Sequence, residues 1–107
     1  MNLPPPIEAY FAADREGDRQ ALLGCFRPDA VVTDEGRVHA GRGEIDAWWR
    51  AAKAKYKHHL EPLDWSETDG AARVRARVSG DFPGSPAELT FAFRRQDGRI
   101  VALEIGA

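Results

Sequence analysis

The chain has 107 residues, of which 43% are hydrophobic and 30% are charged, and its formal net charge is −2. This length suits one domain with a single hydrophobic core, and the composition is that of a soluble globular protein rather than a disordered one. A slightly acidic chain without a basic stripe has little to offer a phosphate backbone. We therefore expect a single domain over residues 1–107 and no nucleic-acid partner.

Cysteine content and hydropathy indicate the cellular compartment in which the protein resides. Cys25 is the only cysteine, so no intramolecular disulfide and no thiol-based metal cluster can form. The segment MNLPPPIEAY has no basic stretch followed by an apolar run, and no stretch approaches the roughly 18 consecutive apolar residues of a membrane span. These features predict a cytoplasmic protein that has no membrane partner.

Helical spacing of apolar residues dominates the first half of the chain. The predicted helices are residues 5–16, a short helix that starts after Asp18 and runs through Phe26, and residues 42–56. The prolines at positions 4–6 suit a helix start, Gly17 suits the first helix end, and Pro28 stops the second helix.

From His58 onward the apolar period changes from about 3.6 to about 2, which indicates strands with one buried face. The predicted strands are residues 30–34, 37–41, 58–67, 73–78, 89–93 and 100–105. Pro62 marks the third as an edge or bulged strand. Helices on one face of a curved, mostly antiparallel sheet make an α+β fold, and the bend of such a sheet leaves a cone-shaped apolar pocket.

The segment DAVVTDEG raises a question about Asp34, which shares a strand face with Ala30 and Val32. Asp34 either starts the turn, where it accepts backbone N–H bonds or pairs with Arg37, or it places a carboxylate at the edge of the apolar interior. In an apolar pocket its pKa would rise, which suits a base that takes a proton from carbon. Spacing alone leaves both readings open.

Aromatic side chains are candidates for the pocket wall. Trp48 and Trp49 point about 100° apart around their helix, so one packs in the core and the other can form a wall or mouth that stacks on a planar ligand. Phe82, Phe91 and Phe93 are candidates of the same kind. These residues indicate an apolar pocket more than they indicate a particular ligand.

The histidines do not form a recognisable metal motif, and we expect no metal. His58 shares a strand face with Leu60 and is a candidate second acid or hydrogen-bond donor, although a structural or surface role remains open. His39 reads as structural. Asp14 lies one helical turn beyond Tyr10 and reads as a cap or ion-pair residue.

A row of arginines at positions 73, 75 and 77 marks one face of a strand. The row reads as a solvated outer face or as a dimer surface.

Three motifs taken in order carry a family resemblance: D-A-V-V-x-D-x-G, H-A-G-R-x-E-I-x-A-W-W and D-G-R-I-V-A-L-E-I. From about Ile7 to Ile105 the chain resembles the NTF2-like superfamily, and within it the SnoaL-like polyketide cyclases and ketosteroid isomerases. The resemblance implies a cystatin-like cone, in which the sheet wraps around about three helices and an internal pocket. It also implies a homodimer through the outer sheet face.

The resemblance assigns roles to individual residues. The general-base aspartate at the end of the first strand matches Asp34, and the oxyanion-binding tyrosine of the first helix matches Tyr10. The second oxyanion donor, an acid in the steroid isomerases, falls on Thr90 by counting back from Gly98 and on Leu89 by matching inward-facing residues. Neither is an acid, and only threonine can donate a hydrogen bond.

The function implied is the binding of a small apolar carbonyl compound, with cofactor-free proton transfer that leads to isomerisation, aldol-type cyclisation or dehydration. Asp34 would be the base and Tyr10 an oxyanion donor, with His58 or Thr90 assisting. The alternative is a non-catalytic ligand-binding or dimerisation domain that keeps the same pocket.

Overall fold

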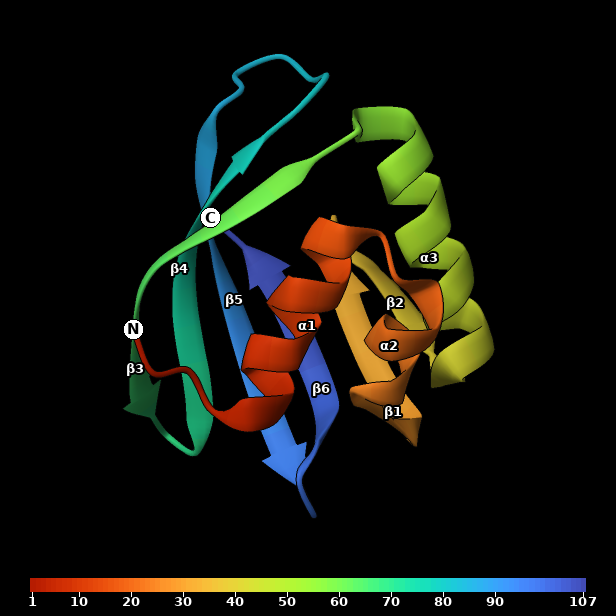
Figure 1. Ribbon diagram of the computed structural model, residues 1–107, viewed down its shortest axis with the longest axis vertical. Helices are drawn as coiled ribbons and strands as arrows, with labels where there is room; N and C mark the ends of the chain where they lie inside the picture. Colours follow the sequence, from red (N-terminus) through yellow and green to blue (C-terminus); the bar gives the residue numbers. More distant parts are fainter.

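Three helices cover one face of a curved six-stranded sheet (Figure 1). The structure is a computed structural model that describes residues 1–107. The helices are α1 (Pro5–Glu16), α2 (Arg19–Gly24) and α3 (Gly41–Tyr56). The strands are β1 (Phe26–Asp34), β2 (Arg37–Ala40), β3 (His59–Thr68), β4 (Ala71–Ser79), β5 (Ala87–Gln96) and β6 (Arg99–Gly106). The predicted α+β class is confirmed.

The strand order is β2-β1-β6-β5-β4-β3. Every neighbouring pair is antiparallel except β1 and β6, which run parallel. That pairing joins the first hairpin to the C-terminal meander. In Figure 1, α1 and α2 lie in front of the sheet and α3 runs beside β1 and β2, while β3 leaves the end of α3 and curves down the left side of the view. The helix-covered face of the sheet is therefore built by elements from both ends of the chain.

Two-residue turns close three of the hairpins. Both central residues have positive φ in Glu35-Gly36 (52° and 73°), in Asp69-Gly70 (54° and 76°) and in Asp97-Gly98 (55° and 77°). Such turns match the right-handed twist of paired strands, and glycine takes the second position without steric cost. The turn residues thus fix the register of strands that carry cavity residues.

The predicted end of the second helix and the predicted start of the first strand are wrong. The helix ends at Gly24, and Phe26 already starts β1, where its fully buried ring faces the core. Pro28 lies inside β1, because the pairing with β6 shifts register between Phe26 and Val31 and leaves room for a residue without an N–H. The edge position of Pro62 is confirmed, since β3 ends the sheet and its pairing with β4 shifts between Pro62 and Asp64.

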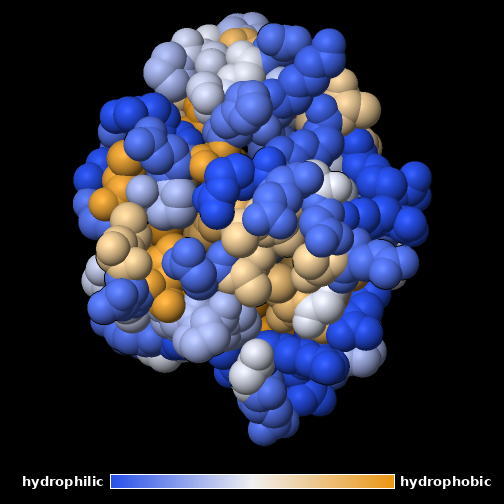
Figure 2. Space-filling model, in the orientation of Figure 1, coloured by the Kyte–Doolittle hydropathy of each residue, from blue (hydrophilic) through white to orange (hydrophobic).

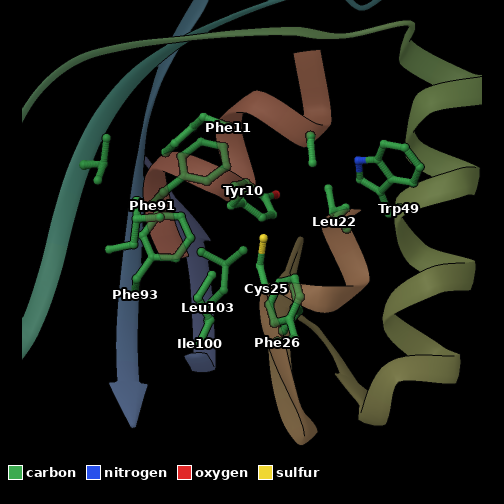
Figure 3. Close-up of a cluster of buried hydrophobic side chains, with 14 of the residues drawn as sticks. Tyr10, Phe11, Leu22, Cys25, Phe26, Trp49, Phe91, Phe93, Ile100 and Leu103 are labelled. Atoms are coloured by element: carbon green, nitrogen blue, oxygen red, sulfur yellow. The ribbon is translucent and has the colours of Figure 1, made fainter. Parts of the chain in front are cut away.

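Aromatic rings from α1 and β5 fill the centre of the core (Figure 3). Tyr10 meets Phe11 and Phe93 edge-on, with centroid separations of 5.4 Å in both cases. Phe91 stacks against Phe93 at 6.3 Å. Edge-to-face pairs of this kind add roughly 0.5–1.5 kcal/mol each beyond the area they bury. These contacts fix α1, and therefore Tyr10, against the sheet.

The outer face of the sheet is charged. Figure 2 shows the opposite, helix-covered side, where hydrophilic residues surround apolar patches. On the outer face Arg75 pairs with Asp64 and Glu88, and Arg77 pairs with Glu61. Exposed pairs contribute about 0–1 kcal/mol each. The homodimer through this face stays a prediction. No helix is long and apolar enough to cross a membrane.

The segment between β4 and β5 packs tightly on the end of α3. The Asp81 amide donates to the Tyr56 carbonyl at 2.6 Å, and a Cβ on Gly80 would lie 2.5 Å from the same oxygen and 3.1 Å from His58 Cα. Only glycine fits this approach. This contact places the Phe82 ring against the Tyr56 ring, with the ring centres 5.9 Å apart.

We expect Gly80→Ala to lower the free energy of unfolding by about 1–3 kcal/mol, because either the segment or the α3 end must move. Urea unfolding followed by circular dichroism measures the change. Gly43→Ala is the control: Gly43 lies in α3 with nothing within 4 Å of an added Cβ, and alanine there should be neutral or stabilise by up to about 1 kcal/mol. A Gly80→Ala protein as stable as wild type would contradict the close approach.

Candidate functional site

A cavity of about 610 Å³ opens between the helices and the bent sheet. Ten of its sixteen lining residues are hydrophobic, and its volume lies within the range of roughly 300–1,000 Å³ typical of small-molecule sites. The residues predicted from the sequence that line it are Tyr10, Asp34, Trp48, His58, Phe82 and Phe91. They come from α1, β1, α3, the α3–β3 connection, the β4–β5 connection and β5. The fold therefore gathers these six residues around one cavity.

Asp34 ends β1 with its side chain turned toward the cavity. Ala30 and Val32, which precede it on the same strand face, are fully buried, and Asp34 continues that alternation at the cavity wall. The indole Nε1 of Trp48 donates to Asp34 Oδ2 at 3.0 Å. Burial raises the pKa of Asp34 and outweighs the lowering effect of this hydrogen bond. Asp34 is thus a half-buried carboxylate with a strengthened affinity for protons.

Tyr10 reaches the same cavity from α1, although its side chain is only 1% exposed. No protein group accepts a hydrogen bond from its hydroxyl. Since no fully buried side-chain oxygen lacks a partner, this hydroxyl must open into the cavity. Burial raises the pKa of Tyr10 well above its ordinary value, with the nearby Asp14 and Asp34 charges adding to the effect. The phenol therefore stays protonated and can donate to a ligand.

Three residues predicted to line the pocket do not. Phe93 is fully buried in the core and is absent from the cavity wall. Trp49 is 5% exposed and packs in the core, where its indole nitrogen faces α1 (Figure 3). The rotation of α3 brings Trp48 to the cavity instead. Thr90 alternates with Leu89 and Phe91 along β5, and both of these line the cavity, so Thr90 faces the other side of the sheet. Leu89 therefore takes the inward position and supplies no hydrogen-bond donor.

The most heavily hydrogen-bonded carboxylate is Asp14, which is 1% exposed. Asp14 Oδ2 accepts from Trp49 Nε1 and from His58 Nε2, both at 2.9 Å. Asp14 Oδ1 accepts from Lys53 Nζ at 2.9 Å. Burial alone would raise the pKa of Asp14, but the hydrogen bonds from His58, Trp49 and Lys53 and the charge of His58 hold it below the ordinary value.

The sequence predicted a cap or an ion pair for Asp14 and missed its link to His58. The available signal was position: Asp14 follows Tyr10 by one turn on the buried face of α1, where an acid needs donors from other elements. His58 is 12% exposed in its side chain and lines the cavity together with Leu60. His59 is exposed, and the His39 ring lies 6.0 Å from the Trp48 ring.

Polar residues that sequence reasoning did not single out border the same cavity. The Tyr56 hydroxyl donates to Glu35 Oε1 at 3.0 Å, and Lys55 Nζ lies 5.0 Å from the centre of the Tyr56 ring. All three line the cavity. No group of three or more His, Cys, Asp or Glu side chains is arranged to hold a metal ion.

Comparison with known proteins identifies the family. The model of the SnoaL-like domain matches residues 7–103. The chain belongs to the SnoaL-like domain family. No curated protein sequence matches it.

Solved structures of similar proteins share the fold. A Sinorhizobium meliloti protein to which a polyketide cyclase activity is provisionally assigned is 50% identical, with 96% of this chain and 94% of that chain covered and a TM-score of 0.94. A Catenulispora acidiphila protein with a ketosteroid isomerase-like fold is 19% identical (99% and 87% covered, TM-score 0.84). A cystatin-fold protein from Novosphingobium aromaticivorans is also 19% identical (100% and 99% covered, TM-score 0.81). The NTF2-like, cystatin-like cone is confirmed.

The pKa of Asp34 gives a prediction about stability. Because its folded-state pKa is raised, ionisation costs the folded state more than the unfolded state, and stability falls as pH rises from the ordinary aspartate value of about 3.9 through the folded value. Asp34→Asn keeps an oxygen for Trp48 and removes this cost. We expect the variant to be more stable than wild type at about pH 7 and equally stable at about pH 3, measured by urea unfolding.

Asp64→Asn is the control of opposite sign. Its pairing with Arg75 lowers the pKa of Asp64, so its charge stabilises the fold above the ordinary aspartate value and this stabilisation is lost as pH falls. Asp64→Asn should therefore be less stable than wild type at neutral pH. An Asp34→Asn protein that is destabilised by the same amount at both pH values would contradict the burial of the Asp34 charge.

Proposed function

We propose that the cavity binds a small apolar carbonyl compound and that Asp34 transfers a proton at the carbon next to the carbonyl, without a cofactor. The reaction class is isomerisation, aldol-type cyclisation or dehydration. The observation that carries the proposal is the joint presence, on one apolar cavity, of a carboxylate with raised proton affinity and a protonated tyrosine hydroxyl free to donate.

The chemistry of enolate formation requires both groups. A carbon acid next to a carbonyl gives up its proton reluctantly, and a carboxylate of raised pKa is a stronger acceptor than one in water. As the C–H bond breaks, negative charge moves to the carbonyl oxygen, where a preorganised donor in a low-dielectric site is most effective. Asp34 supplies the acceptor and Tyr10 the donor. Trp48 restrains the Asp34 carboxylate through its indole N–H.

The cavity and the relatives support a ring-forming or ring-bearing ligand. The lining is mainly apolar, and Phe82 and Trp48 offer flat faces for stacking. The Sinorhizobium meliloti relative, half identical in sequence, carries a provisional assignment as a polyketide cyclase. A polyketide-like ketone fits the apolar lining, the flat walls and the proton-transfer groups together.

Leu89 favours a second candidate function, binding without catalysis. At this position the steroid isomerase pattern calls for an acid that helps Tyr10 bind the oxyanion, and leucine cannot do so. A cavity with one such donor still holds a carbonyl compound by burial and a single hydrogen bond. Turnover, rather than binding, therefore separates the two candidates.

We expect wild-type protein to convert one or more members of a panel of cyclic enones and polyketide-like ketones. Asp34→Asn should lower kcat by about 10²–10⁴-fold while ligand binding, followed by intrinsic tryptophan fluorescence, is retained. Tyr10→Phe should lower kcat by about 10–10³-fold, because it removes one oxyanion donor. Thr90→Val, on the far side of the sheet, is the control and should leave both quantities unchanged.

Two outcomes would go against the enzyme. Binding in the cavity with equal, uncatalysed turnover in wild type and Asp34→Asn would assign the protein to the binding class. Turnover that survives in Asp34→Asn would remove Asp34 as the base.

A further inference from the structure

The proposed function leaves the Asp14–His58 pair unused, although it lies against the same cavity. Asp14 is an acceptor-only group when ionised, and its lowered pKa keeps it ionised at neutral pH. The hydrogen in the 2.9 Å contact therefore belongs to His58 Nε2. In a neutral imidazole the other nitrogen, Nδ1, must then carry a lone pair.

His58 Nδ1 has no partner within the protein. No buried side-chain nitrogen or oxygen of the chain lacks a hydrogen bond, so Nδ1 is not enclosed by protein atoms. The ring lines the cavity and its side chain is 12% exposed. The accessible nitrogen of His58 therefore opens on the cavity as a hydrogen-bond acceptor.

Neighbouring donors hold this arrangement in place. Lys53 Nζ donates at 2.9 Å both to Asp14 Oδ1 and to the backbone carbonyl of His58, so one ammonium group restrains the carboxylate and the histidine together. Trp49 Nε1 restrains Asp14 Oδ2 from a third side. The Lys53 charge also offsets the Asp14 charge, which lets the pair remain buried.

We propose that His58 is a second proton acceptor on the cavity, serving a hydroxyl group of the ligand, and that Asp14 is its positioning residue, held in turn by Lys53 and Trp49. The inference rests on the proposed function for the carbonyl part of the ligand. It adds a hydroxyl or enol group to the ligand class. Asp34 then exchanges a proton with a carbon atom of the ligand, and His58 exchanges one with an oxygen atom.

The proton balance of the His58 step is simple. The ligand O–H bond breaks, its electron pair stays on oxygen, and the proton joins the lone pair of Nδ1. The imidazolium that forms keeps its Nε2–H on Asp14, whose negative charge stabilises it. The reverse transfer returns the proton to the product oxygen. The charged and titratable groups facing His58 are Asp14 and Lys53 directly and, around the cavity, Tyr10, Asp34, Glu35, Lys55 and Tyr56.

Nitrogen-15 NMR of histidine-labelled protein tests the arrangement directly. At about pH 8.5, where imidazole rings are ordinarily neutral, we expect His58 to show a protonated Nε2 and an unprotonated Nδ1, with His58→Gln identifying its signals among the three histidines. The probe 2-naphthol, a planar apolar phenol, should shift the Nδ1 signal at saturation. The probe 2-methoxynaphthalene lacks the hydroxyl and should leave it in place.

Variants test the positioning role of Asp14. An amide cannot accept from three donors at once, so Asp14→Asn should abolish the single tautomer and lower kcat by about tenfold or more with little change in KM. The matched control is Asp46→Asn. Asp46 lies on α3, is 7% exposed and pairs with Arg19 and Arg50, and it does not line the cavity. Asp46→Asn should leave the His58 signals and kcat unchanged. If Asp14→Asn does not fold, the tautomer and probe measurements on wild-type protein still decide the matter.

Specific results would overturn the inference and separate it from the proposed function. A protonated Nδ1 in the free protein, or an Nδ1 signal unmoved by bound 2-naphthol, excludes His58 as the acceptor, whatever Asp34 does. A kcat unchanged in His58→Gln excludes it from the reaction. Conversely, the expected tautomer and probe shift, with no turnover of any carbonyl compound by wild type, would support the His58 site and reject the proposed function.

Discussion

The structure around the cavity depends on satisfying one buried charge. Asp14 sits on the inner face of α1, where an unpaired carboxylate would cost several kcal/mol, and three donors from outside that helix compensate it. Two of them, on Trp49 and Lys53, tie α1 to α3, and the third fixes His58 at the start of the sheet meander. One acid therefore sets the spacing between the elements that line the cavity, and the aromatic contacts of Tyr10 fill the space that remains.

Asp14 and Asp34 show how the same side chain acquires different properties in one small fold. Asp14 has three donors, and they lower its pKa despite burial. Asp34 has the indole of Trp48 and a largely apolar surround, and burial raises its pKa. In acid–base sites, two groups take different catalytic roles because their environments give them different proton affinities. Here the lowered acid is suited to hold a histidine, and the raised acid is suited to exchange protons with a ligand.

The sequence predicted what local periodicity and turn chemistry determine. The alternation that places Asp34 on the inner face and the helical position of Tyr10 both follow from spacing. It could not choose between Trp48 and Trp49, because the rotation of α3 depends on which indole finds Asp14. The choice between Leu89 and Thr90 depends on the register of β5, which is set by pairing with distant strands. The Asp14–His58 contact spans 44 positions in the chain, so no local pattern contains it.

Leu89 stands where the resemblance to the steroid isomerases implies an acid, and the position of His58 bears on this difference. A site built for enolate isomerisation alone benefits from two donors on one oxygen, and Leu89 removes one of them. A site that handles protons at a carbon and at a separate oxygen needs a second acid–base group elsewhere on the wall. The Asp14–His58 pair provides a group of that kind, held by residues of α1 and α3 rather than by β5. The two proposals together therefore describe a cavity that moves protons at two atoms of its ligand, as aldol-type cyclisation and dehydration do.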